Sequence, residues 1–136
     1  MSVVVEKNFR VLIVSENLNF RNNLATKLRL ENYAVELATG GFHLLHLLEQ
    51  IDKDFSLIII NDNMHDMPGF EAISLIRQSK TKQELPILYV SRNDSEDEVC
   101  NMVFTGANEY IVQSTSFLPI IERAKKYFRQ FQQNAA

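Results

Sequence analysis

The apolar run at residues 57–60 (Leu-Ile-Ile-Ile) constrains the fold of this chain more than any other stretch, because three of its four residues are β-branched. A run without polar interruption predicts a strand that is covered on both faces, as in a parallel sheet shielded by helices. Asn61, Asp62 and Asn63 follow the run directly. Because ligands of open parallel sheets bind beyond the carboxyl ends of the strands, these three residues mark a candidate functional site.

Strand and helix patterns alternate along the rest of the chain. Short apolar runs predict strands at 9–14, 33–38, 57–60, 86–90 and 109–112. Apolar residues at helical spacing predict helices at 17–30, 44–51, 69–79, 95–105 and 117–131. Five strand–helix units joined by right-handed crossovers predict an α/β fold with one parallel five-stranded sheet, in the strand order 2-1-3-4-5 and with helices on both faces.

Several residues have expected places within these elements. Asn17 and Ser95 are expected to cap two helices, and Gly106 to end the fourth helix. The residues expected on the inward faces of the last three helices are Phe70, Ile73 and Ile76, then Val99, Met102 and Val103, then Phe117, Ile121, Ala124, Phe128 and Phe131. Cys100 is expected to be a packing residue, and His43 and His46 lack the neighbouring Cys or carboxylate ligands of a metal site.

The length and composition predict a single domain over residues 1–136, with its core at about 9–132, a leader at 1–8 and a tail at 133–136. The net charge of -3 and the pI near 5.6 disfavour a nucleic-acid-binding surface. A single cysteine excludes an internal disulfide and is typical of a reducing compartment. No apolar run is long enough for a membrane span, and residues 1–10 lack the pattern of a signal peptide. We therefore expect a soluble, cytoplasmic domain that contacts neither nucleic acid nor membrane.

Polar residues follow four of the five predicted strands. They are Ser15 and Glu16 after the first strand, Asn61 after the third, Ser91 after the fourth and Gln113 after the fifth. The carboxyl ends of parallel strands lie at one edge of a sheet, so the topology alone predicts that these side chains converge there.

The motifs at 11–17, 57–69, 85–91 and 105–112 together resemble those of the receiver domains of bacterial response regulators, over residues 9–132. This resemblance implies a flavodoxin-like, doubly wound (βα)5 fold. It also implies a signal-transduction module of a two-component or phosphorelay pathway, which is not an enzyme and which acts on a protein partner. In that family an Asp accepts a phosphoryl group, an acidic pair holds Mg2+, a Ser or Thr receives the phosphoryl oxygens and a Lys balances the charge.

The chain departs from the family at several of these positions. Asn61 stands at the phospho-acceptor position, and an amide is a poor nucleophile. Ser15 replaces one member of the acidic pair and leaves Glu16 alone, so Mg2+ binding is expected to be weak or absent, and no other cofactor is implied. Gln113 replaces the Lys, and Ser114 the Pro that follows it. Ser91 and Tyr110 match the Ser/Thr and aromatic switch positions.

The leading hypothesis is a pseudo-receiver that binds partners without phosphorylation, and two alternatives stay open: a working receiver phosphorylated at an atypical site, or a small-ligand-binding flavodoxin-like domain.

Asp62 is a poor substitute acceptor, because a neighbour on an extended strand end points to the opposite side, and it is expected to be a solvated loop residue. Arg92 is expected to plug the cleft and to supply a counter-charge to Glu16. His65 stands where the family usually has Pro.

A second candidate site is an interaction face formed by the fourth helix, the fifth strand and the fifth helix. The residues proposed for it are Glu96, Asp97, Phe104, Tyr110, Arg123 and Lys126. In receiver-like proteins this face commonly carries partner contacts, and the opposite charges on the two helices suit a homodimer. Ordinary solvated charge is an equally good interpretation of the same residues.

Overall fold

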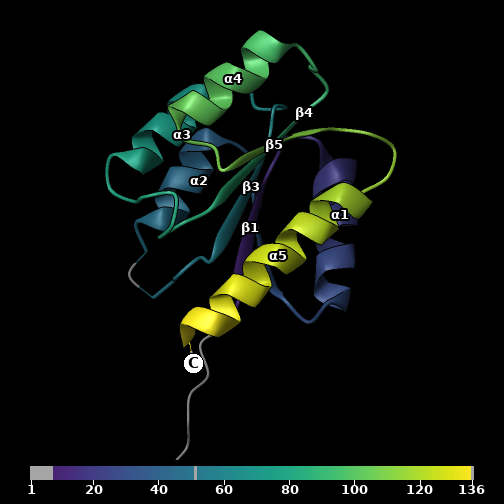
Figure 1. Cartoon of the computed structure of the whole chain (residues 1–136), viewed down its shortest axis with the longest axis vertical. Helices are drawn as coiled ribbons and strands as arrows, with labels where there is room; N and C mark the ends of the chain where they lie inside the picture. The colour runs from purple at the N-terminus through teal and green to yellow at the C-terminus, as the bar shows by residue number, and fades with distance from the viewer. Residues whose placement is uncertain (1–7, 51, 136) are drawn as a thin grey trace, which may run out of the picture.

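The structure, a computed structural model, describes residues 8–50 and 52–135. Its elements are β1 (Arg10–Val14), α1 (Leu18–Leu30), β2 (Ala34–Ala38), α2 (Gly41–Leu48), β3 (Leu57–Asn61), α3 (Gly69–Arg77), β4 (Ile87–Ser91), α4 (Glu96–Thr105), β5 (Glu109–Val112) and α5 (Leu118–Ala135). All strand pairs are parallel, in the order β2-β1-β3-β4-β5. Helices α1 and α5 cover one face of the sheet, and α2, α3 and α4 cover the other (Figure 1). The predicted fold class and strand order are confirmed.

The apolar run in β3 is buried on both sides of the sheet, as its sequence predicts. Ile58 and Ile60 belong to the core beneath α2, α3 and α4, whereas Leu57 and Ile59 belong to the core beneath α1 and α5. All four side chains have no exposed surface. Alternate residues therefore serve two separate cores, which is why the first four residues of this strand are all apolar.

The helix signals in the sequence have the expected physical basis. The Asn17 side chain accepts a hydrogen bond from the backbone N–H of Phe20, and Ser95 accepts one from that of Glu98. Both bonds satisfy N–H groups that have no partner within the helix. Gly106 ends α4 with a φ of 138°, a conformation that strongly favours glycine.

The structure corrects several expectations about the helices on the α2–α4 side. Phe70 is 56% exposed, because α3 contacts the sheet through Ala72, Ile73 and Ile76. In α4 only Met102 is buried, whereas Val99 and Val103 are half-buried and Cys100 is exposed. Helix α4 lies over the β4–β5 edge of the sheet, so a single side chain reaches the core and Cys100 is not a packing residue (Figure 1).

Two helix boundaries also differ from the expected ones. Helix α2 begins at Gly41 rather than at 44, and residue 51, the predicted end of this helix, lies outside the described residues. Helix α5 continues to Ala135, through most of the predicted tail. Its polar end is exposed, but Phe128 and Phe131 pack edge-on against Phe9 with ring centroids 5.3 and 5.4 Å away, so the contacts of two aromatic side chains extend the helix.

Arg77 connects the end of α3 to two loops, the one between α3 and β4 and the one between α4 and β5, and nothing in the sequence pattern indicates this role. Its guanidinium donates to the carbonyl of Gly106 at 2.8 Å and to the side-chain oxygen of Asn108 at 2.8 Å. It also donates to the carbonyls of Lys80, Thr81 and Leu85. Burial lowers the pKa of Arg77, and these neutral oxygens take the place of water around its guanidinium. Within the described ranges, no helix is long and apolar enough to cross a membrane.

Candidate functional site

The predicted site lies at the carboxyl edge of the sheet, and Asn61 is at its centre. Ser15, Asn61 and Ser91 are the buried polar residues of the structure, each at most 2% exposed. The Ser15 hydroxyl donates to Asn61 Oδ1 at 3.0 Å. Asn61 Nδ2 donates to the Val90 carbonyl at 3.1 Å and to Gln113 Oε1 at 3.0 Å. The structure therefore brings together the residues at three of the altered positions, Ser15, Asn61 and Gln113.

Each polar atom of the Asn61 side chain is satisfied by the protein itself. Besides the Ser15 hydroxyl, Asn61 Oδ1 accepts the backbone N–H of Asn63 at 3.3 Å. Both protons of Nδ2 are used by the two acceptors named above. The Ser15 oxygen in turn accepts the backbone N–H of Asn17 at 3.0 Å. Ser15 and Asn61 are buried, Gln113 is half-buried, and the three are hydrogen-bonded to one another, so the Asn61 side chain has a fixed geometry with its polar atoms satisfied.

Asp62 occupies a different place from the one expected. Its Oδ2 accepts the Ser91 hydroxyl at 2.7 Å and the backbone N–H of Arg92 at 3.4 Å. The residue is exposed, but its carboxylate is turned toward Ser91 and is not a free, solvated group. The alternation of an extended strand does not apply here, because β3 ends at Asn61. Ser91 thus has an internal acceptor, and its oxygen also accepts the N–H of Asn93 at 3.1 Å.

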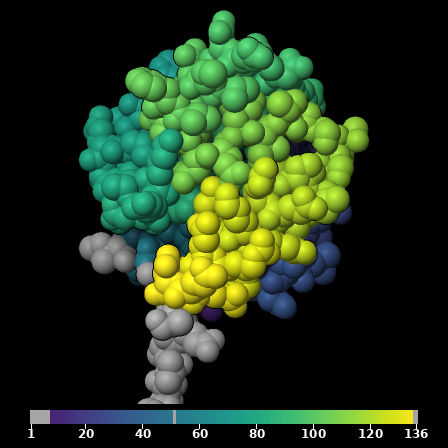
Figure 2. Space-filling model, viewed as in Figure 1, coloured from purple at the N-terminus to yellow at the C-terminus, as the bar shows by residue number. Residues whose placement is uncertain are grey.

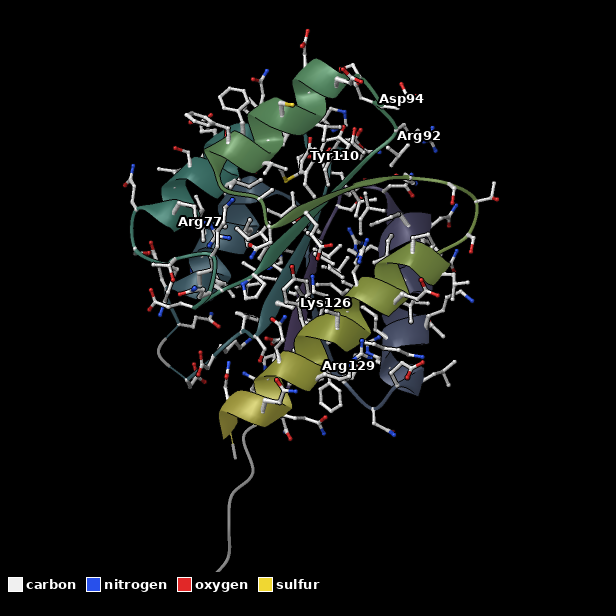
Figure 3. The ribbon with its side chains drawn as sticks, in the orientation of Figure 1. Arg77, Arg92, Asp94, Tyr110, Lys126 and Arg129 are labelled. Carbon is white, nitrogen blue, oxygen red and sulfur yellow. The ribbon has the colours of Figure 1, made fainter. Side chains whose placement is uncertain are left out.

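Glu16 is paired with His65 and not with Arg92. One carboxylate oxygen of Glu16 accepts the backbone N–H of His65 at 2.8 Å, and the other contacts the ring Nδ1 of His65. Arg92 is exposed on the loop between β4 and α4 (Figure 3). Its described hydrogen bond is from its backbone N–H to Asp62. The expectation that Arg92 supplies a counter-charge to Glu16 is therefore wrong, although Arg92 lines a cavity at this edge of the sheet together with Asn17 and Gln113. The loop after β3 supplies the partner because it folds back over the end of β1.

Tyr110 fixes the loop between β4 and α4 from the side of β5. Its hydroxyl donates to the Asn93 carbonyl at 2.5 Å, and its ring lies against that of Tyr89 with centroids 5.5 Å apart. Burial raises the pKa of Tyr110, and the nearby carboxylates of Glu98 and Asp62 raise it further. The hydroxyl therefore stays protonated at neutral pH and remains a donor to the loop.

Asp66 is a structural carboxylate that sequence reasoning missed. It accepts the backbone N–H groups of Gly41 at 3.0 Å and Phe42 at 2.9 Å, at the start of α2. These bonds, the one from Phe42 foremost, lower the pKa of Asp66. A Cβ on Gly40 would lie 2.8 Å from the Asp66 carboxylate, so a larger residue there would displace this carboxylate. The Gly-Gly pair in the sequence is the only signal of this contact.

The remaining residues singled out in the sequence lie away from this network. Glu96 and Asp97 are exposed in the first turn of α4, and Phe104 is 94% exposed. Arg123 contacts Glu109 of β5 at 2.9 Å, and Lys126 contacts it at 3.7 Å, so these cations have a partner within the chain. His43 Nδ1 accepts the N–H of Thr39, and His46 is exposed. Within the described part of the chain, no three His, Cys, Asp or Glu side chains are grouped as metal ligands.

The fold and the site together define a flavodoxin-like signalling domain of the receiver class. The chain belongs to the response regulator receiver domain family, whose model matches residues 11–125. It is 26% identical over 133 residues to the chemotaxis protein CheY-3 of Vibrio cholerae, which covers 96% of this chain and 99% of that protein. It is 24% identical to the transcriptional regulatory protein HprR of Escherichia coli, covering 89% of this chain and 52% of HprR. Among solved structures, the receiver domain of the Francisella response regulator 1452 superposes with a TM-score of 0.81 at 18% identity, covering 91% of this chain and 99% of that one.

Proposed function

We propose that this domain is a pseudo-receiver, a receiver fold that acts through protein contacts without being phosphorylated at the usual position. The observation that carries the proposal is the closed network around Asn61. An amide that uses both of its protons and its oxygen for internal hydrogen bonds has no nucleophilic atom to offer. The family membership supports a role in two-component signalling, and we place the domain in the cytoplasm for the same reason.

The residues around Asn61 also fit a Mg2+ ion poorly. Magnesium prefers six oxygens with carboxylate charge among them, and Glu16 is the sole carboxylate of the altered pair. Both of its oxygens are engaged by His65, and the Asn61 oxygen already accepts two hydrogen bonds. We therefore expect weak Mg2+ binding or none. The triple variant Ser15→Asp, Asn61→Asp, Gln113→Lys should bind Mg2+, and isothermal titration calorimetry should show this gain relative to Asn61→Asp alone.

A protein partner is expected on the face formed by α4, β5 and α5. Figure 2 shows this face, with α4 above α5 on the viewer's side. Phe104 is 94% exposed on α4, and Val112 of β5 is 46% exposed. Exposed apolar side chains ringed by charge are typical of interaction sites. This face is proposed for a protein partner, with no role in binding nucleic acid.

The test is incubation of the purified domain with Mg2+ and a small phosphoryl donor such as acetyl phosphate, followed by intact-mass measurement. The proposal predicts no added phosphoryl group under conditions in which a working receiver, run in parallel, is modified. A stoichiometric adduct that neutral hydroxylamine removes would contradict it, because this reaction identifies an acyl phosphate and leaves a phosphoserine or phosphothreonine intact.

One observation favours a second candidate function, phosphorylation at Asp62. Its carboxylate lies 2.7 Å from the Ser91 hydroxyl, next to the position of the lost acceptor, and the residue is exposed to solvent. If an adduct forms in the same experiment, the variant Asp62→Asn should abolish it and Asp66→Asn should not. An adduct that survives Asp62→Asn would exclude this candidate.

A further inference from the structure

Helix α2 has an unusual composition for a helix on the surface of a sheet. Its sequence, Gly-Phe-His-Leu-Leu-His-Leu-Leu, contains no Lys, Arg, Asp or Glu. A surface helix normally has one apolar and one charged face, and a helix that is apolar all round is normally covered. Leu44 and Leu47 are buried in the core, but Phe42 is 66% exposed, and Leu45 and Leu48 are half-buried.

The exposed side of α2 adjoins an apolar groove shared with α3. The groove has a volume of about 310 Å³ and is lined by Leu45, Leu48, Glu49, Leu75, Ile76, Ser79 and Lys80. Leu75 of α3 is 38% exposed, and the two helices lie side by side with their C-terminal ends together (Figure 1). We call Phe42, Leu45, Leu48, Glu49, Leu75 and Lys80 the α2–α3 face.

Charge indicates what covers this face. Glu49 and Lys80 give it one charge of each sign, at the same end of the groove. By contrast, α1 carries three cations and no acid, and α4 three acids and no cation, so two copies that met through either helix would bring like charges together. On the α2–α3 face, an identical copy meets exposed apolar side chains and one charge of each sign.

A simple geometry makes the face complementary to itself. A two-fold axis parallel to the two helices places α2 of one copy over α3 of the other, because the rotation exchanges their positions across the groove. This rotation leaves the position of each residue along the helix axes unchanged. Glu49 of each copy therefore lies opposite Lys80 of the other, and Leu45 and Leu48 lie opposite Leu75.

We propose that this domain self-associates as a symmetric dimer through the α2–α3 face. The α4–β5–α5 face then stays free on both copies, so the dimer presents two equivalent surfaces to a partner. A dimer with two equivalent surfaces can bind a partner that has two binding sites more tightly than a monomer can, although each surface makes the same contacts as before. The proposal does not depend on whether the domain is phosphorylated.

The test is sedimentation velocity of the full chain from about 5 to about 500 µM, which spans the dissociation constants of weak dimers. The wild type should shift from monomer to dimer in this range. Phe42→Asp and Leu75→Asp, both at exposed positions, should each weaken association about tenfold or more. Phe104→Asp is the matched control, an exposed Phe on the α4–β5–α5 face, and should leave it unchanged. Circular dichroism of each variant verifies the fold.

Charge reversal tests the proposed geometry independently of any loss of apolar area. Glu49→Lys and Lys80→Glu should each weaken dimerisation, and the double variant should recover it, because the two charges exchange places across the two-fold axis. A wild type that is monomeric throughout the range overturns the proposal. So does a dimer that is lost in Phe104→Asp and kept in Phe42→Asp, and so does a double variant that recovers nothing.

Discussion

The substitution Asn61→Asp tests the closed network most directly, because the two side chains have the same shape and differ in one donor and one charge. The Asn61 amide donates to the Val90 carbonyl and to Gln113 Oε1 from a site that is 2% exposed. An ionised Asp would place a charged oxygen against both acceptors. The Gln113 amide can rotate and donate instead, whereas the Val90 carbonyl is fixed in β4.

The expected cost follows from these contacts. An uncompensated buried charge destabilises a protein by about 3–5 kcal/mol. Hydrogen bonds from Ser15 and from the rotated Gln113 amide return about 1 kcal/mol, so we expect a loss of about 3 kcal/mol at pH 7. This environment raises the pKa of the new carboxyl in the folded state. The unfolded-state pKa of an Asp carboxyl is about 4. Below this pH the Asn61→Asp variant should be about as stable as the wild type, and its stability should fall as the pH rises above this value.

Urea denaturation followed by circular dichroism, at several values between pH 4 and pH 7, measures this loss. With a slope of about 2 kcal/mol/M, the midpoint should fall by roughly 1.5 M at pH 7 and by little at pH 4. Asn63→Asp is the control, since Asn63 is two residues further on and only half-buried, and its effect should stay within about 0.5 kcal/mol. Equal midpoints for Asn61→Asp and wild type at pH 7 would refute the closed network.

Three further substitutions test other contacts. Asp66→Ala should lower the free energy of unfolding by about 1 kcal/mol at pH 7, because it removes the hydrogen-bond acceptor at the start of α2. The ionised carboxylate stabilises the fold at pH values above its unfolded-state pKa. The difference in urea midpoint between the variant and the wild type should therefore vanish as the pH falls through the lowered folded-state pKa. Arg77→Met should cost about 2–4 kcal/mol, because it leaves the oxygens of two loops without their donor, and thermal unfolding should show this. Arg92→Ala should change stability by less than about 0.5 kcal/mol in the same assay, since the described contact of Arg92 is made by its backbone; a larger loss would restore a role for its side chain.

The strands and their order could be predicted because both depend on local patterns. The apolar run at 57–60 needs cover on two faces wherever it lies, and the crossover rule then leaves few topologies. The convergence of Ser15, Asn61 and Gln113 follows from the same rule, since parallel strands end at one edge. These predictions required no knowledge of side-chain orientation.

The contacts that the sequence did not reveal join residues that are distant along the chain and placed by loops. The Asp66 carboxylate reaches α2 across 24 residues, and the Arg77 guanidinium reaches Asn108 across 31. His65 was noted only as a departure from the family, although its loop brings it to Glu16. Phe70 and Cys100 were misplaced for a related reason: how much of a helix is buried depends on how far it overhangs the sheet, which residue spacing does not encode.

The donors and acceptors of residues 15, 61 and 113 match one another, which indicates that the three departures from the family's residues depend on one another. Asn61 needs a donor for its oxygen and an acceptor for its nitrogen, and Ser15 and Gln113 supply one of each. A Lys at 113 only donates and would face the donating nitrogen of Asn61. Gln113→Lys alone should therefore destabilise the domain, yet it should stabilise the Asn61→Asp variant, where the lysine meets a carboxylate. A double-mutant cycle with a coupling of about 1–3 kcal/mol would show this dependence, and additive effects would show that the altered positions are independent.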